Sequence, residues 1–93
     1  MEGLNAMDVS NSTGETTDYK VTVKGGNIPL APPAPQRGRL KPGEQHRVEA
    51  GAGKSWNAEF SIDGQVIAAI EVHSASARLE LTRDNAAYRV KVV

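Results

Sequence analysis

Cysteine is absent from this 93-residue chain, and aromatic residues make up only 4% of it. Without thiols, the fold cannot be held by disulfides or by a thiolate-bound metal. Eleven basic residues balance eleven acidic ones, so the formal net charge is zero. The charges alternate along the chain, whereas nucleic-acid binding requires a concentrated cationic surface. We therefore expect no nucleic-acid partner.

Long apolar runs are also missing. No stretch of the sequence is long enough to cross a bilayer. The first eight residues, Met-Glu-Gly-Leu-Asn-Ala-Met-Asp, lack the basic and apolar regions of a signal peptide. The sequence predicts no membrane insertion, and a cytoplasmic location unless the chain is a module of a longer exported protein. Its length is that of one small domain, so residues 1–93 are expected to form a single unit.

What the chain does contain is a two-residue alternation of apolar and polar side chains. From Trp56 to Ile62 every second residue is apolar, and segments 77–82 and 88–92 repeat this rhythm. Residues 18–24 alternate in the same way. Period two is the pattern of a strand with one dry and one wet face, and several such strands at short spacing predict a β-sandwich or barrel. About seven antiparallel strands are expected, or at most eight, and no helix.

Two turns can be predicted in detail. Lys41-Pro-Gly-Glu places proline second and glycine third, which is the pattern of a type II turn. At Asp63-Gly64, a two-residue turn would place Trp56 opposite Glu71. A three-residue loop instead pairs Trp56 with Ile70, and it likewise pairs Phe60 with Val66 and Ala58 with Ala68. We prefer the loop because each apolar residue then meets another.

The segment Val66–Val72 is apolar on both faces for much of its length. Such a strand needs cover on two sides. This pattern is typical of a central strand, or of a strand whose outer face meets another molecule.

The segment Ile28–Arg39 departs from the alternation. Its prolines cannot donate to a sheet ladder, so it is predicted to be a proline-rich loop at residues 28–39, running extended across an edge or end of the sheet. Ala31–Arg37 matches a proline-rich ligand pattern of the Src-homology-3 type, and a preformed extended segment loses little entropy on docking. The candidate partner-binding residues are Pro32, Pro33, Pro35, Arg37 and Arg39.

The turn Leu40-Lys-Pro-Gly-Glu before an alternating strand, and the closing Tyr88-Arg-Val-Lys-Val, resemble the small immunoglobulin-like sandwiches common in bacterial multidomain proteins. The resemblance covers most of the chain and implies an antiparallel immunoglobulin-like β-sandwich. The chain differs from antibody-type domains because no cysteine pair flanks its tryptophan. Such modules act as spacers, adhesins or partner-binding units, and the fold does not decide among these roles.

Motifs for catalysis and for cofactor binding are weak. Gly51-Ala-Gly-Lys-Ser looks like the end of a phosphate-binding loop, but Val48 occupies the position of the first glycine and a strand is expected to follow. His46 and His73 lie on different expected strands without a third ligand at metal-site spacing. No serine has the sequence context of an activated nucleophile. We expect no enzyme, no cofactor and no metal.

Two features bear on glycans. Asn11-Ser-Thr is an N-glycosylation sequon, which matters only in a eukaryotic secretory pathway, and it is also a turn signal. The four aromatic residues all fall on apolar sides and are expected in the core, whereas a sugar platform would need one exposed ring. These residues are Tyr19, Trp56, Phe60 and Tyr88.

The sequence as a whole predicts a non-enzymatic module. It would bind another protein, or another copy of itself, through an edge strand or through the proline-rich loop. The alternative is a module that binds a carbohydrate or a small ligand through an exposed aromatic ring or an end cavity.

Overall fold

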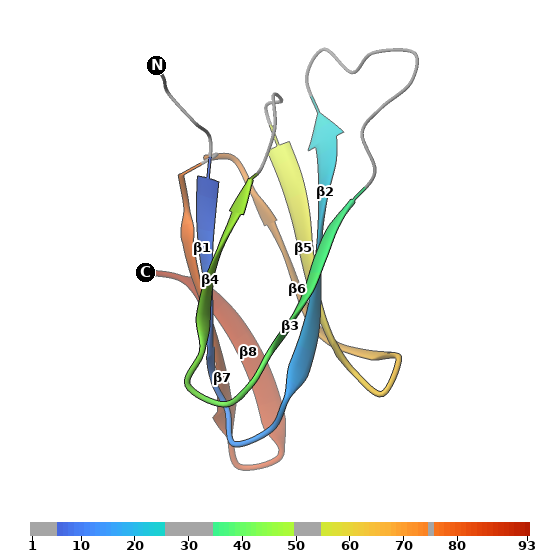
Figure 1. The fold of residues 1–93 in the computed structure, drawn as a ribbon, viewed down its shortest axis with the longest axis vertical. Coiled ribbons are helices and arrows are strands. Elements are labelled where there is room, and N and C mark those ends of the chain that lie inside the picture. The colour runs from blue at the N-terminus through green and yellow to red at the C-terminus, as the bar shows by residue number, and fades with distance from the viewer. Residues whose placement is uncertain (1–5, 26–34, 50–54, 75) are drawn as a thin grey trace.

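The computed structural model describes residues 6–25, 35–49, 55–74 and 76–93 (Figure 1). Within these ranges the chain forms eight strands and no helix, arranged as two packed four-stranded sheets. The strands are β1 (Ala6–Ser12), β2 (Thr17–Gly25), β3 (Gln36–Leu40), β4 (Gln45–Glu49), β5 (Ser55–Ile62), β6 (Gln65–Val72), β7 (Arg78–Asp84) and β8 (Ala87–Val92). The predicted all-β sandwich is confirmed.

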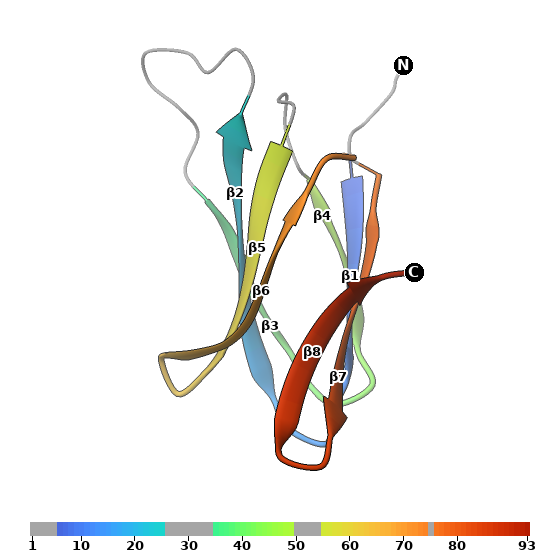
Figure 2. The same cartoon turned by 180° about the vertical axis from the view of Figure 1, so that it is seen from behind.

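The strand order is β4-β1-β7-β8 in one sheet and β3-β2-β5-β6 in the other. Neighbouring strands are antiparallel except for β1 and β7, which run parallel. Edge strand β4 of the first sheet therefore faces edge strand β3 of the second, and β8 faces β6. Figure 1 looks onto the side with β3 and β4, and Figure 2 looks onto the side with β6 and β8.

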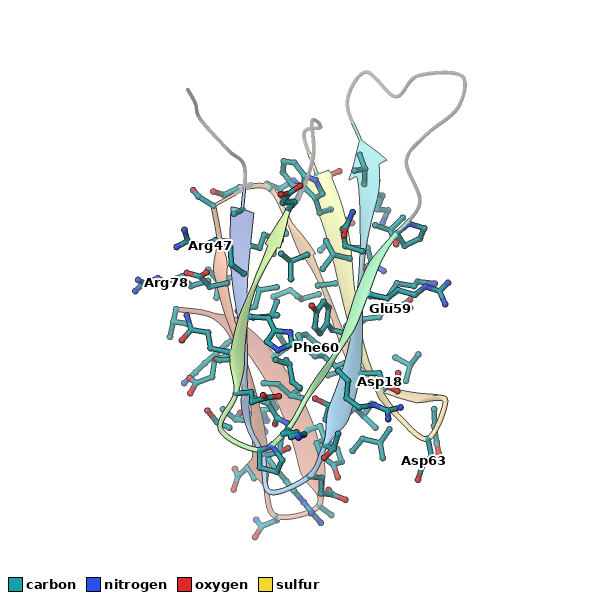
Figure 3. The ribbon with its side chains drawn as sticks, in the orientation of Figure 1. Asp18, Arg47, Glu59, Phe60, Asp63 and Arg78 are labelled. Atoms are coloured by element: carbon teal, nitrogen blue, oxygen red, sulfur yellow. The ribbon has the colours of Figure 1, made fainter. Side chains whose placement is uncertain are left out.

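The core lies between the sheets, where the alternating residues of both inner faces meet. Trp56 is only 2% exposed, and Phe60 is fully buried. Figure 3 shows Phe60 between the two sheets. The prediction of a core position is confirmed for Tyr19 as well, but it is wrong for Tyr88. Tyr88 is half-buried because it lies near the turn end of β8, where polar neighbours rather than the opposite sheet surround its ring.

The turn between β3 and β4 has the predicted form. The Glu44 N–H donates to the Lys41 carbonyl oxygen at 3.0 Å, and Gly43 has φ of +83°. A positive φ at the third turn position requires glycine in a type II turn. This turn carries the chain from one sheet to the other.

The β5–β6 hairpin differs from the predicted three-residue loop. Asp63 and Gly64 alone form the turn, with φ of 51° and 82°, the left-handed pair that an Asp-Gly sequence adopts most readily. Ile62 therefore pairs with Gln65. A bulge then shifts the register between Phe60 and Ser61.

Beyond this bulge, the predicted strand pairs are also wrong. Trp56 pairs with Val72 rather than Ile70, and Phe60 pairs with Ala68 rather than Val66. Ala58 likewise pairs with Ile70 rather than with Ala68. The bulge returns the apolar residues to the inner face, so apolar residues still meet, but two positions further along β6. Its other consequence is that Val66 faces outwards.

The proline-rich loop is shorter than predicted. Gln36–Leu40 form β3 at an edge of the sheet, antiparallel to β2. Past Pro35 every residue of this segment has an N–H group, so nothing prevents it from pairing with a neighbour. The expectation of an extended segment at a sheet edge is confirmed for this part. Residues 28–34 lie outside the described residues.

Candidate interaction surface

Cross-strand ion pairs cover the outer face of the β3-β2-β5-β6 sheet. Lys24 Nζ lies 2.7 Å from Glu71 Oε1, and Arg39 Nε lies 2.8 Å from Asp18 Oδ1. The hydrogen bond from Lys24 lowers the pKa of the Glu71 carboxyl group. The hydrogen bond to Asp18 raises the pKa of the Arg39 guanidinium. Paired charges in contact with solvent therefore cover this face.

The outer face of the other sheet is polar in the same way. Asp8 lies between two cations, 3.3 Å from Arg47 Nε and 3.7 Å from Arg78 Nε. Figure 3 shows Arg47 and Arg78 extending outwards on the same side of the molecule. Lys91 and Glu80 form a further pair at 3.7 Å. Charged side chains thus occupy both broad faces of the sandwich, and apolar contact is left to the sides.

A shallow groove of about 630 Å³ crosses the outer face of the β3-β2-β5-β6 sheet at its hairpin end. Its charged side chains are mostly paired, including Lys20 with Glu59 at 3.8 Å. Among the described residues, the side chain of Arg37 has no ion-pair or hydrogen-bond partner. The groove is lined by Asp18, Tyr19, Lys20, Arg37, Gly38, Arg39, Glu59, Ser61, Gly64 and Val66.

Only part of the predicted partner-binding set falls on described residues. Pro32 and Pro33 lie outside them. Pro35 is half-buried directly before β3, and Arg37 and Arg39 are exposed on that strand. Of these two cations, Arg39 is occupied by Asp18 and Arg37 remains available.

The side of the sandwich between β3 and β4 is closed by a polar aromatic contact. Tyr19 Oη lies 3.2 Å from His46 Nδ1, and the two rings meet edge to face with centroids 5.8 Å apart. Gly38 leaves room for this ring, since a Cβ there would lie 2.7 Å from Tyr19 Cε2. Burial raises the pKa of Tyr19. His46 is thus a partly buried, hydrogen-bonded residue.

The opposite side, between β6 and β8, is apolar. Half-buried Ile67, Ile70 and Val90 pack against the core there, and we call these three residues the apolar seam. Among the described residues, the only exposed large hydrophobic side chains also belong to β6, to β8 and to the residue after β8. They are Val66 at 54%, Val92 at 55% and Val93 at 67%.

The four edge strands differ in length and charge. β3 and β4 have five residues each and carry exposed arginines, and the six residues of β8 include Arg89 and Lys91. β6 has eight residues, no proline and no cation, and Glu71 is its only charged residue. Short length, proline and positive charge are the usual protections of an edge strand. β6 has none of these, and the bulge at its start is its main interruption. The prediction that it is a central strand is wrong, which leaves the expectation that it meets another molecule.

The side chain of Asn11, the acceptor residue of the sequon, forms structural hydrogen bonds. Asn11 is 1% exposed, and its Nδ2 donates to the carbonyl oxygens of Glu15 at 2.7 Å and Leu40 at 3.0 Å. Its Oδ1 accepts from the Thr13 N–H at 2.9 Å. Glycosylation would require a free Nδ2. Asn11 instead joins the β1–β2 turn to the end of β3, a role that the sequence signals only through its Asx-turn pattern.

Tyr88 forms a cluster with Glu15 and Arg83 at the turn end of the molecule. Its hydroxyl donates to Glu15 Oε2, and Arg83 Nη1 lies 2.9 Å from the same oxygen. The Arg83 guanidinium also lies 5.4 Å from the centre of the Tyr88 ring. The hydrogen bond to Glu15 raises the pKa of Tyr88. Tyr88, the least buried of the four aromatic residues, is therefore already in contact with Glu15 and Arg83.

The described residues contain no group of three or more metal-ligating side chains. His73 is exposed and 3.5 Å from Glu71, whereas His46 lies on β4 beside Tyr19. Of the glycine-rich segment, residues 51–54 lie outside the described ranges, and Ser55 begins β5, so a strand follows it as predicted. A helix long and apolar enough to span a bilayer is likewise not found in the described part of the chain.

The fold and surface define a small β-sandwich with charged faces and one apolar side. No protein-family model matches this chain, and neither does any curated protein or solved structure.

Proposed function

We propose that this chain is a non-enzymatic, immunoglobulin-like β-sandwich module that binds another protein by strand addition at β6. The observation that carries the proposal is the contrast among the four edges. Three are short or cationic, and β6 is long, uncharged over most of its length and flanked by the apolar seam.

Strand addition uses chemistry that any edge strand offers. The outer N–H and C=O groups of an edge strand pair with an extended segment, and its side chains select which segment fits. On β6 the exposed side chains are Val66 near the start and Ala69 at mid-strand, with the polar Gln65 and Glu71 towards the two ends. A partner strand with small or β-branched residues suits this surface. A strongly charged strand does not.

The immunoglobulin-like class is supported by three features. Two sheets close over a single core tryptophan, the β3–β4 turn has its type II geometry, and an alternating strand ends the fold. The parallel pairing of β1 with β7 departs from a purely antiparallel sandwich.

The carbohydrate-binding alternative has less support. Sugar recognition commonly uses an exposed aromatic face, and the rings of Tyr19, Trp56 and Phe60 are buried. Tyr88 is half-buried and engaged by Arg83 and Glu15. The proline-rich loop remains a second route for protein binding, because Arg37 is exposed and unpaired among the described residues.

The experiment selects peptides from a random extended library against the whole chain and maps the bound peptides by backbone amide shifts. We expect shifts centred on β6, lost in Ala69→Lys and kept in Ala87→Lys. Both alanines are exposed on edge strands, so they form a matched pair. Peptides that shift β3 and bind Ala69→Lys normally, but fail with Arg37→Ala, would replace this proposal with the loop route.

A further inference from the structure

The protein partner proposed above can be specified further, and this step rests on that proposed function. We infer that the strand occupying the β6 edge is β6 of a second copy of the same chain, running antiparallel across a two-fold axis. The pairing would join the two β3-β2-β5-β6 sheets into one continuous sheet of eight strands.

Charge favours self-pairing at this edge. The formal net charge of the chain is zero, so two copies approach without long-range repulsion. The only charged residue of β6, Glu71, is compensated by Lys24 of its own chain at 2.7 Å. Each of the other edges carries an arginine, and self-pairing there would bring like charges together.

An antiparallel register centred on Ala69 suits the side chains. Ala69 then faces its own symmetry mate, and Glu71 lies opposite Ile67 of the other copy. The two Glu71 residues are separated by four residues along the strand, about 13 Å, which is beyond the screening length at physiological salt. No like charges meet. A two-fold axis of this kind gives a self-complementary, closed interface.

The apolar seam supplies the second argument. Ile67, Ile70 and Val90 are half-buried in the monomer because β6 and β8 are the last strands of their sheets. A second copy added at β6 covers these side chains from the side, and removing apolar surface from water drives association. The opposite side of the sandwich offers no such gain, because Tyr19 and His46 close it.

The length of the ladder sets the expected strength. The bulge at the start of β6 ends regular pairing towards Val66, so in the register centred on Ala69 the ladder runs over Ile67–Glu71. A contact of this size belongs to the small, transient class of interfaces. Dimerisation should therefore depend on concentration.

The test is sedimentation equilibrium of the whole chain from low micromolar to millimolar concentration. The parent should move from the monomer mass to twice that mass. Ala69→Lys should weaken dimerisation by roughly tenfold or more, since a lysine on the edge would face the lysine of its mate. Ala87→Lys should dimerise like the parent. Blue-shifted Trp56 fluorescence in all three proteins confirms that they are folded.

A parent that stays monomeric at every concentration overturns the inference, as does an Ala69→Lys variant that dimerises equally well. If the monomeric parent still binds selected peptides at β6, only the identity of the partner is wrong and the proposed function stands. If neither a dimer nor a β6-bound peptide is found, both proposals fail.

Discussion

At the scale of single residues, the end of the sandwich near the β1–β2 turn depends on buried polar groups rather than on apolar contacts. Asn11 supplies hydrogen bonds to two segments far apart in the chain, and its own backbone pairs with the β3–β4 turn through the Gly43 N–H at 2.8 Å. A buried group left without its partner costs more than the bond itself contributes. At this end of the sandwich, substitutions of the buried polar residues should therefore cause the largest losses of stability.

The first prediction concerns Asn11. Asn11→Ala leaves the carbonyl oxygens of Glu15 and Leu40 without their donor, and it should lower the free energy of unfolding by about 2–3 kcal/mol in urea titrations. The control is Ser12→Ala, where the exposed hydroxyl bonds only to Glu80 and the loss should be below about 0.5 kcal/mol. Equal effects of the two substitutions would contradict the role assigned to Asn11.

The second prediction compares two threonines. Thr17 Oγ1 is buried and has no hydrogen-bond partner among the described residues, whereas Thr13 Oγ1 lies 2.6 Å from Asn11 Oδ1. Thr17→Val removes a desolvated hydroxyl and should stabilise the protein by about 1 kcal/mol. Thr13→Val should destabilise it by about 1–2 kcal/mol. Thermal unfolding of the two variants gives the signs, and a loss of stability in Thr17→Val would show that its hydroxyl is paired.

At the scale of elements, the inward faces of the strands could be predicted from alternation, and their neighbours could not. The inward positions of Met7, Val9 and Phe60 follow from local period two. Whether Val66–Val72 lies at the centre or the edge of a sheet depends on which distant strands pair with it, and the strand itself carries no such signal. The apolar residues on the outer face of this strand therefore lie at the protein surface and not in the core.

The errors at β3 and at the β5–β6 hairpin have separate physical causes. The prolines before β3 suggested a longer irregular segment, but they place no restriction on residues after Pro35. At Asp63-Gly64 the turn geometry and the apolar pattern favour different registers, and the chain satisfies both by inserting a bulge. Of the predicted binding residues, Pro35, Arg37 and Arg39 lie within the described ranges. The apolar seam could not be predicted, because it joins two strands far apart in sequence.

The third prediction tests how the closed side of the sandwich is built. Gly38→Ala places a methyl group against the buried Tyr19 ring, which is rigid and in contact with His46. The overpacking should destabilise the protein by about 1–3 kcal/mol in urea titrations. Gly14→Ala is the control, because a Cβ at Gly14 meets nothing within 4 Å and stability should hardly change. A neutral Gly38→Ala would mean that the ring can move aside.

At the scale of the whole molecule, charge and apolar surface are separated. Ion pairs cover both broad faces of the sandwich, and the contact between Tyr19 and His46 closes the side between β3 and β4. The apolar residues are concentrated on the opposite side, between β6 and β8. Exposed apolar surface next to an unpaired strand edge is a hazard for an isolated monomer. The partner strand proposed for β6 would cover this surface.

The fourth prediction concerns pH. The sequence contains two tyrosines, and the pKa of each is raised, Tyr19 by burial and Tyr88 by its hydrogen bond to Glu15. A raised folded-state pKa means that the stabilisation is present below the unfolded value and is lost as the pH rises through the folded value. Ultraviolet titration should show both phenols ionising later than free tyrosine. Tyr88→Phe should remove one of the two transitions, and phenols that ionise at the free value would contradict both assignments.

Hydrogen exchange of the backbone amides on the four edge strands is the most direct test of the central claim. It should be measured in dilute protein, in concentrated protein and with saturating selected peptide. Added protection should be confined to Ile67–Glu71 of β6 in at least one of the two occupied states, while β3, β4 and β8 remain unchanged. Protection that appears on another edge, or on none, would contradict the account.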